Sequence, residues 1–287
     1  MKGILLAGGK GNRLWPLTNS INKHFLPIFD KPMIHYSLST LMLAGINQIL
    51  IISSYQNLKL FQQHFGNGNS LGLTLEYREQ KAPIGIPNGI SIAKDFIKKD
   101  NFALMLGDNI FHGVGLGKSL RQFQDTSGAK IFCANVSSPQ DFGVVEILNN
   151  KIVSLVEKPI SPRSKLAITG LYFFDSKAIN LVSELQLSAR GEYEIVDLLK
   201  LYLDINELEY EILPRGTAWL DTGTPIGILE ASQYVETIQK RQGLQIGCLE
   251  EIAWRNQWIS DQELLNLARQ TPNSNYAKYL YELVDQS

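Results

Sequence analysis

Short runs of aliphatic residues alternate with helical spacings of apolar positions along the first half of the chain. The aliphatic runs predict strands at residues 3–7, 48–53, 73–78 and 102–106. The segments between and after these runs predict helices near residues 34–44, 57–65, 89–99 and 116–125. Strands and helices that alternate in this way form a parallel sheet with helices on both faces, so we expect an α/β fold.

The pattern changes in the second half of the chain. After an apolar run at residues 129–136, the runs lie close together with short polar breaks, which predicts antiparallel strands added to the sheet at residues 143–148, 151–157 and 167–175. A helix over 191–204 and a strand over 207–213 follow, and from Thr224 onward nearly every segment has a helical pattern. We find no internal repeat and no clear linker, so we expect one composite domain with a helical appendage.

Composition and charge narrow the class of protein. The chain has 287 residues, 44% of them hydrophobic, and its net charge of -1 argues against nucleic acid or a membrane surface as a partner, since both favour dense basic patches. No apolar run approaches the roughly 18 residues of a membrane span and no signal peptide is recognised, so we expect a cytoplasmic protein. Cys133 and Cys248 lack disulfide or zinc spacing and are predicted to be buried thiols.

The first candidate site is the glycine-rich stretch LLAGGKGNRLWPLT, residues 5–18, directly after the first predicted strand. It matches neither the P-loop order nor the G-x-G-x-x-G spacing. Gly8, Gly9 and Gly11 nevertheless allow backbone N–H groups to approach an anion, and Arg13 adds a guanidinium suited to phosphate. A plain strand-to-helix turn explains one or two of these glycines, but not all three with the arginine. We therefore predict a phosphate-binding loop.

Three charged residues add to this loop. Lys23 lies among apolar and proline residues in NKHFLPIFDKP, Asp108 follows the strand at 102–106, and Asp221 follows a short apolar run in AWLDTGT. Each has a plainer alternative, because a lone lysine is usually solvated and an aspartate after a strand often caps a turn. Together with the glycine loop, they outline a site where Mg²⁺ and basic groups hold a polyphosphate.

Eight blocks of the sequence, in order, resemble those of one enzyme family. They are LLAGGKGNRLWPLT, LPIFDKPMIHYSLSTLMLAGI, LGDNIF, SLVEKP, ITGLYFFD, ARGEYEIVD, AWLDTGT and EASQYVETIQKRQGL. The chain resembles the glucose-1-phosphate thymidylyltransferases of the sugar-nucleotide pyrophosphorylase family. The resemblance implies a doubly wound, mostly parallel, Rossmann-like nucleotidyltransferase fold. It also implies a Mg²⁺-dependent condensation of dTTP with α-D-glucose 1-phosphate to dTDP-glucose and pyrophosphate, as part of dTDP-sugar biosynthesis, by a homotetramer.

The resemblance also implies roles for single residues. The catalytic residues would be Arg13, Lys23 and Asp108, and Mg²⁺ would be held by Asp108 and Asp221. The nucleotide would be bound by Leu6, Gly8, Gly9, Gly11, Gln80, Gly85 and Asp108. The sugar phosphate would be bound by Gly143, Glu157, Lys158, Ile168, Tyr172 and Arg190.

The resemblance further implies how the chain is divided. Residues 1–240 would form the nucleotidyltransferase domain, with a nucleotide half over about 1–128 and a sugar-phosphate half over about 129–240. Residues 241–287 would form the helical appendage, which is not expected to be an independent domain.

The chain departs from the family pattern mainly around the nucleotide base. The family block reads Q-P-S-P-D-G-L-A-Q-A, where residues 80–89 read QKAPIGIPNG. Ile84 replaces an aspartate, and Pro87, Asn88 and Gly89 replace the residues that open the next helix, so we expect a reshaped and more tolerant base loop. His24 likewise replaces a glutamine. Two alternatives stay open: an enzyme that uses UTP or a modified sugar 1-phosphate, and a weakened paralogue that acts as a nucleotide-sugar-binding regulatory subunit.

Overall fold

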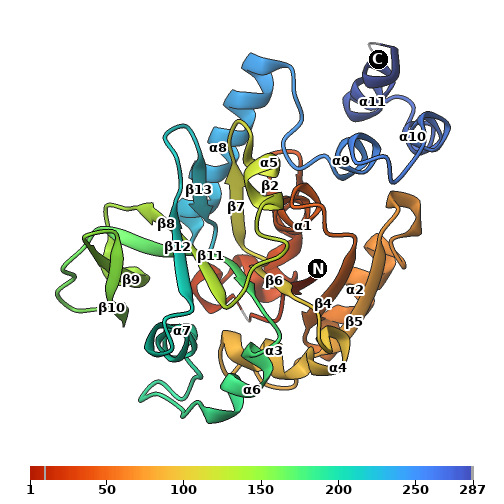
Figure 1. Ribbon diagram of the computed structural model, residues 1–287. Helices are drawn as coiled ribbons and strands as arrows, with labels where there is room; N and C mark the ends of the chain where they lie inside the picture. Colours follow the sequence, from red (N-terminus) through yellow and green to blue (C-terminus); the bar gives the residue numbers. More distant parts are fainter. Residues whose placement is uncertain (10, 286–287) are drawn as a thin grey trace.

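A computed structural model describes residues 1–9 and 11–285, so Lys10 of the predicted phosphate loop and residues 286–287 of the predicted appendage lie outside the described part. The first half of this part forms four parallel strands in the spatial order β6-β1-β4-β5 (Figure 1). Their bounds are β1 Lys2–Leu6, β4 Gln48–Ser53, β5 Thr74–Glu79 and β6 Phe102–Leu106. The four strands predicted from the aliphatic runs are confirmed to within one residue.

The second half extends the same sheet mostly with antiparallel strands. These strands are β8 Ala129–Asn135, β9 Gly143–Leu148, β10 Lys151–Glu157, β11 Leu166–Phe174 and β12 Leu208–Ile212. Strand β11 runs antiparallel to β6, β8 and β9, and β10 runs antiparallel to β9, whereas β12 pairs in parallel with β8. The predicted fold class, a mostly parallel sheet with antiparallel additions, is confirmed.

Helices cover both faces of the sheet because successive strand residues point to opposite sides. Leu5 belongs to the hydrophobic core on one face, under α1 (Met33–Leu43), α2 (Tyr55–Phe65) and α5 (Leu116–Arg121). Its neighbour Ile4 belongs to the core on the other face. That face is covered by α3 Ile86–Ile92, α4 Lys94–Ile97, α6 Ala178–Leu181 and α7 Ile195–Asp204.

Three predicted helices differ from the observed ones by more than two residues at one end. The helix expected near 116–125 ends at Arg121, the last residue of α5. The helix expected near 89–99 begins earlier, at Ile86, with proline in its first turn, and it is divided at Ala93 into α3 and α4. A proline is tolerated there because a first-turn N–H has no partner within the helix. The helix expected over 191–204 begins only at Ile195, because Gly191 has a left-handed φ of 73° and the backbone N–H of Tyr193 bonds outside any helix.

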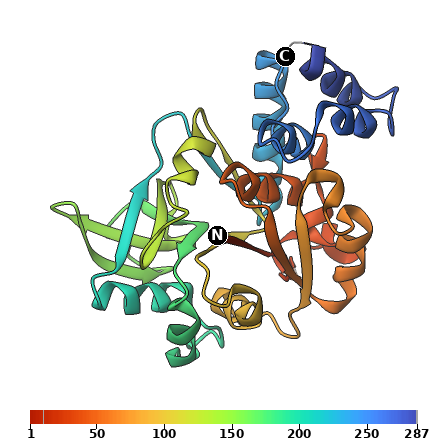
Figure 2. The ribbon, with the colours of Figure 1, turned by 45° about the vertical axis from the view of Figure 1, so that its right-hand side comes forward.

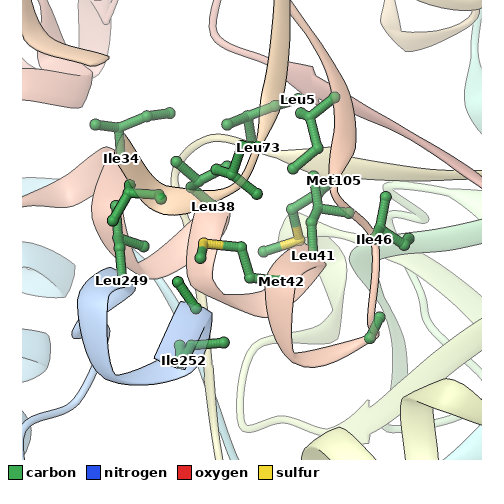
Figure 3. Close-up of a cluster of buried hydrophobic side chains, with 14 of the residues drawn as sticks. Leu5, Ile34, Leu38, Leu41, Met42, Ile46, Leu73, Met105, Leu249 and Ile252 are labelled. Carbon is green, nitrogen blue, oxygen red and sulfur yellow. The ribbon is translucent and has the colours of Figure 1, made fainter. Parts of the chain in front are cut away.

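The C-terminal helices gather at one end of the molecule, next to segments from near the N-terminus (Figure 2). They are α8 Pro225–Gln242, α9 Leu249–Arg255, α10 Asp261–Ala268 and α11 Asn275–Asp285. Leu249 and Ile252 of α9 lie beside Leu38 and Met42 of α1 in one buried cluster (Figure 3). The helices predicted after Thr224 therefore pack on the core of the first half, while the predicted division at residue 240 stays a prediction.

Short elements complete the chain. Two pairs of short strands lie apart from the main sheet, β2 Pro27–Ile28 with β3 Lys31–Pro32 and β7 Asn109–His112 with β13 Ala218–Asp221. Single 3-10 turns occur at Asn12–Leu14, Leu17–Asn19, Lys23–Phe25, Asn69–Leu71, Pro139–Asp141 and Val182–Glu184. Cys133 and Cys248 are free and buried, as predicted. Within residues 1–9 and 11–285, no helix combines the length and the apolar character needed to cross a membrane.

Candidate active site

The two predicted aspartates are brought together by the ribbon of β7 and β13. In this antiparallel pair, Asp221 lies opposite Asn109, the residue that follows Asp108. The backbone N–H of Thr222 donates to the Asp108 carbonyl at 3.0 Å, and the Thr222 hydroxyl donates to the same oxygen at 2.7 Å. Strand pairing therefore aligns two carboxylates that are more than a hundred positions apart in the chain.

Asp108 forms an ion pair with Lys23. The Lys23 ammonium donates to Asp108 Oδ2 at 2.5 Å, and both side chains are largely buried, with 12% and 15% of their surface exposed. Burial by itself raises the pKa of the Asp108 carboxyl, but the charge and hydrogen bond of Lys23 outweigh it and hold that pKa below its usual range. Asp108 is consequently ionised at neutral pH.

The ionised form of Asp221 is less stabilised by its surroundings than the ionised form of Asp108. Its Oδ1 accepts from the backbone N–H of Gly223 at 2.6 Å. Burial, followed by repulsion from the Asp108 charge, raises the pKa of Asp221 above its usual value. No cluster of three or more histidine, cysteine or acidic side chains suited to a metal occurs in the described residues.

The glycine loop packs against the functional side chains that follow other elements. A side-chain carbon on Gly9 would lie 3.1 Å from the Lys23 ammonium nitrogen, and one on Gly8 would overlap the Gln80 side-chain oxygen. A cavity of about 480 Å³ is lined by Gly8, Gly9, Lys23 and Gln80, together with residues at the start of α2. Of the predicted nucleotide-binding residues, Gly8, Gly9 and Gln80 line this cavity, whereas Leu6, Gly11, Gly85 and Asp108 lie outside the lining.

A second cavity, of about 140 Å³, lies beside Asp221. Residues predicted for the sugar phosphate, the triphosphate and the metal line it together: Gly143, Glu157, Lys158, Ile168, Tyr172, Arg13 and Asp221. Gly143 and Glu157 meet because β9 and β10 pair these two residues directly. Burial raises the pKa of Glu157, and the charges of Lys158 and Arg190 oppose that rise. The roles of these residues stay predictions.

Arg190 does not line this cavity but bonds to Glu157, which does. Its guanidinium donates to Glu157 Oε1 at 3.2 Å and to both oxygens of Glu194, at 2.5 and 3.1 Å. Arg190 is not among the lining residues of the cavity. Its guanidinium therefore lies at the rim, where it holds the Glu157 carboxylate in one orientation.

Sequence reasoning missed several residues of this second cavity, and among them Asn109 and Trp219 are bonded to each other. The Trp219 indole N–H donates to Asn109 Oδ1 at 2.6 Å, and the backbone N–H of Gly170 donates to the same oxygen at 3.0 Å. Asn109 Nδ2 donates in turn to Asp108 Oδ1 at 3.1 Å. An amide directly after Asp108 in LGDNIF was the available signal, but its partner Trp219 is far away in sequence. Asn109 thus connects the aspartates to the second cavity.

The base loop is tethered through its backbone. The N–H of Tyr193 donates to the Ile84 carbonyl at 2.9 Å, and Gly85 forms an isolated parallel bridge with Tyr193. Gly85 has a φ of 110°, and a side-chain carbon at this position would overlap the Tyr193 carbonyl oxygen. Glycine is therefore required at position 85, and Ile84 needs no polar side chain to attach the loop.

His24, which follows Lys23, is buried and uncharged. It is 1% exposed, and its Nδ1 lies 2.9 Å from Asn22 Oδ1. Burial, with a smaller contribution from the Lys23 ammonium, lowers the pKa of His24 to about 3. Because the His24 imidazole is neutral, the positive charge beside Asp108 comes from Lys23.

We expect the exchange His24→Gln to flatten the pH dependence of stability. Unfolded histidine titrates near 6.5, so between roughly pH 6.5 and 3 the unfolded chain binds a proton that the folded chain does not, and stability falls as pH falls. The free energy of unfolding of the variant, relative to the parent chain, should rise by about 1.4 kcal/mol for each unit of acidification. Urea unfolding between about pH 7 and 4 measures this, and parallel pH curves for the two proteins would contradict it.

Comparison with known proteins agrees with this geometry. The family model described as nucleotidyl transferase matches residues 2–238, and the chain belongs to this family, so it is a nucleotidyltransferase. Among curated proteins, it is 47% identical over 287 residues to a glucose-1-phosphate thymidylyltransferase of Mycolicibacterium smegmatis, with both chains covered completely. It is also 47% identical to the glucose-1-phosphate thymidylyltransferase of Neisseria meningitidis, over 99% of each chain.

A solved structure extends the comparison to three dimensions. The Bacillus anthracis protein, assigned as a glucose-1-phosphate thymidylyltransferase and crystallised with sucrose, superposes with a TM-score of 0.76 at 37% identity. The match covers 82% of this chain and 94% of that chain. The resemblance found in the sequence blocks is therefore confirmed, both for the family and for the fold.

Proposed function

We propose that this chain condenses dTTP with α-D-glucose 1-phosphate to give dTDP-glucose and pyrophosphate, with the help of Mg²⁺. The full-length relatives that carry the name glucose-1-phosphate thymidylyltransferase support this reaction. The observation that carries the proposal is the position of Asp108 between two cavities. It contacts Lys23, which lines the glycine-loop cavity, and Asn109, which lines the second cavity.

The reaction needs charge stabilisation more than proton transfer. A phosphate oxygen of the sugar phosphate attacks the α-phosphorus of dTTP, the bond from that phosphorus to the β-phosphate bridging oxygen breaks, and pyrophosphate leaves with the electron pair. Because the second pKa of a phosphate monoester is near 6, the attacking oxygen is already deprotonated at neutral pH. Lys23 and Arg13 would neutralise the triphosphate, and the backbone N–H groups of the glycine loop would hold it in line for attack.

The aspartate pair fits Mg²⁺. Two buried carboxylates, one of which has its pKa raised by the other, form a site that a hard cation would stabilise. Mg²⁺ commonly takes one or two carboxylates and completes its shell with water and substrate phosphates, so Asp108 and Asp221 would suffice. When bound, the ion would neutralise charge on the phosphates during transfer.

The second cavity suits a sugar phosphate. The Glu157 carboxylate and the Asn109 amide would accept and donate hydrogen bonds with sugar hydroxyls, and Trp219 would cover the ring. Lys158 would approach the sugar phosphate, while Arg190 would contact it or orient Glu157. The homotetramer is a prediction that rests on the resemblance, and the cytoplasmic location stays a prediction from the sequence pattern.

A substrate panel tests the proposal. Pyrophosphate release is measured for dTTP, dUTP, UTP, CTP, ATP and GTP, each with glucose 1-phosphate, galactose 1-phosphate and glucosamine 1-phosphate. We expect the highest kcat/KM for dTTP with glucose 1-phosphate. A higher value with UTP or another sugar would favour the first alternative, and tight nucleotide-sugar binding without turnover of any pair would favour a regulatory subunit.

A further inference from the structure

We propose that Asn88 is a positioning residue that fixes the amide of Gln80 and thereby sets the preference for the nucleotide base; this rests on the proposed function. Gln80 follows β5, is 8% exposed and lines the glycine-loop cavity. Its Nε2 donates to Asn88 Oδ1 at 3.0 Å. Its Oε1 lies against Gly8, at a distance that only glycine allows. The two ends of this amide are therefore held on two sides, by Asn88 and by the backbone at Gly8.

Gly89 explains how Asn88 comes within reach of Gln80. A side-chain carbon on Gly89 would lie 2.5 Å from Leu6 Cδ2, so the start of α3 packs closely against the end of β1. A larger residue at position 89 would move the first turn of α3 away from β1, or would displace Leu6. The short side chain of Asn88 then spans the remaining gap to Gln80. Two of the residues that depart from the family block, Asn88 and Gly89, therefore contact Gln80 and Leu6, respectively.

The orientation of Gln80 determines which pyrimidine its amide can pair with. Thymine and uracil present an N3–H donor flanked by carbonyl acceptors, whereas cytosine presents an N3 acceptor beside an amino donor. An amide whose Nε2 is held by Asn88 presents a fixed order of donor and acceptor to the base. On the proposed function, this would be the order that pairs with the N3–H and the neighbouring carbonyl of thymine and uracil. Pairing with cytosine requires the amide to rotate by half a turn, which breaks the bond to Asn88 unless Asn88 rotates as well.

Two substitutions of Asn88 by residues of similar size distinguish the effect of its hydrogen-bond acceptor from the effect of its side-chain shape. Asn88→Leu removes the acceptor, and Asn88→Asp keeps an acceptor that cannot become a donor. For both variants, kcat/KM is measured with dTTP, dUTP and CTP at saturating glucose 1-phosphate, and nucleotide affinity is measured without the sugar phosphate. In the leucine variant, the preference for dTTP over CTP should fall by roughly three- to tenfold, the range expected for loss of one hydrogen bond.

The aspartate variant is the matched control. Its charge should raise KM for every triphosphate, but the ratio of dTTP to CTP should be maintained or increased. The preference of dTTP over dUTP should be the same in all variants, because both bases share the paired edge. Ser91→Leu, on an exposed position of the same helix, should leave every ratio unchanged. If Asn88 had a purely structural role, its replacement would lower kcat/KM by the same factor for every nucleotide.

The outcomes keep the two proposals apart. An active leucine variant with an unchanged ratio of dTTP to CTP would overturn the positioning role and leave the proposed function intact. If the leucine variant does not fold, Asn88→Ala removes the same acceptor without adding an apolar branch and gives the same test. If the parent chain does not turn over dTTP, the proposed function fails, and the binding ratios measured without sugar phosphate still decide the role of Asn88.

Discussion

Replacing either Asp108 or Asp221 by asparagine is expected to lower kcat by about 10³-fold or more. The exchange preserves shape but removes one negative charge from the pair proposed to hold Mg²⁺, and metal stabilisation of a phosphoryl transition state contributes several kcal/mol. Pyrophosphate release at saturating dTTP and glucose 1-phosphate, measured over a range of Mg²⁺ concentrations, checks this. Near-normal turnover in either variant would exclude that aspartate from the metal site.

The same two exchanges should have opposite effects on the stability of the metal-free protein. Asp108→Asn leaves the Lys23 ammonium, 12% exposed, without its counter-charge, and breaking a buried pair costs about 3–5 kcal/mol. Asp221→Asn removes a carboxylate whose pKa is raised by burial and by Asp108, so the free energy of unfolding should stay unchanged or increase. Urea unfolding in the presence of a chelator measures both. Equal destabilisation by the two exchanges would contradict this account of the pair.

Replacing Lys23 by methionine is expected to lower kcat by about 10²- to 10³-fold, the usual effect of removing one positioned donor to a developing charge. Methionine is similar in length but carries no charge, so the exchange tests the ammonium and not the shape. Because the sugar phosphate is proposed to bind in the other cavity, KM for glucose 1-phosphate should change much less than kcat. Steady-state kinetics with each substrate varied in turn gives this comparison.

The double variant Lys23→Met with Asp108→Asn separates the structural from the chemical role of the pair. Removing both charges leaves no unpaired buried charge, so the double variant should be more stable than Asp108→Asn alone. It should nevertheless remain as inactive as the worse single variant. If the double variant is as unstable as the sum of the single ones, the two side chains do not act as a pair.

The sequence alone determined the sheet and the elements nearest to it. Strand positions followed from runs of aliphatic residues, because a strand buried on both faces is apolar along most of its length. The interiors of β1, β4 and β6 have this pattern. The glycine loop and the aspartate after β6 could be found for a related reason: ligands bind at the carboxyl ends of parallel strands, so polar residues in those loops are informative. Helix bounds were less certain where a backbone N–H bonds to a segment outside the helix, as the N–H of Tyr193 does.

The tertiary structure alone decided which of these residues meet. Strands β7 and β13 were not predicted, because each has only four residues and their pattern is too short to read, yet their register sets Asp221 beside Asp108. The bonds from Trp219 to Asn109 and from Gln80 to Asn88 likewise join separate segments. Local sequence carries the propensity of each segment, but such contacts depend on how the segments pack, and packing is a property of the whole chain.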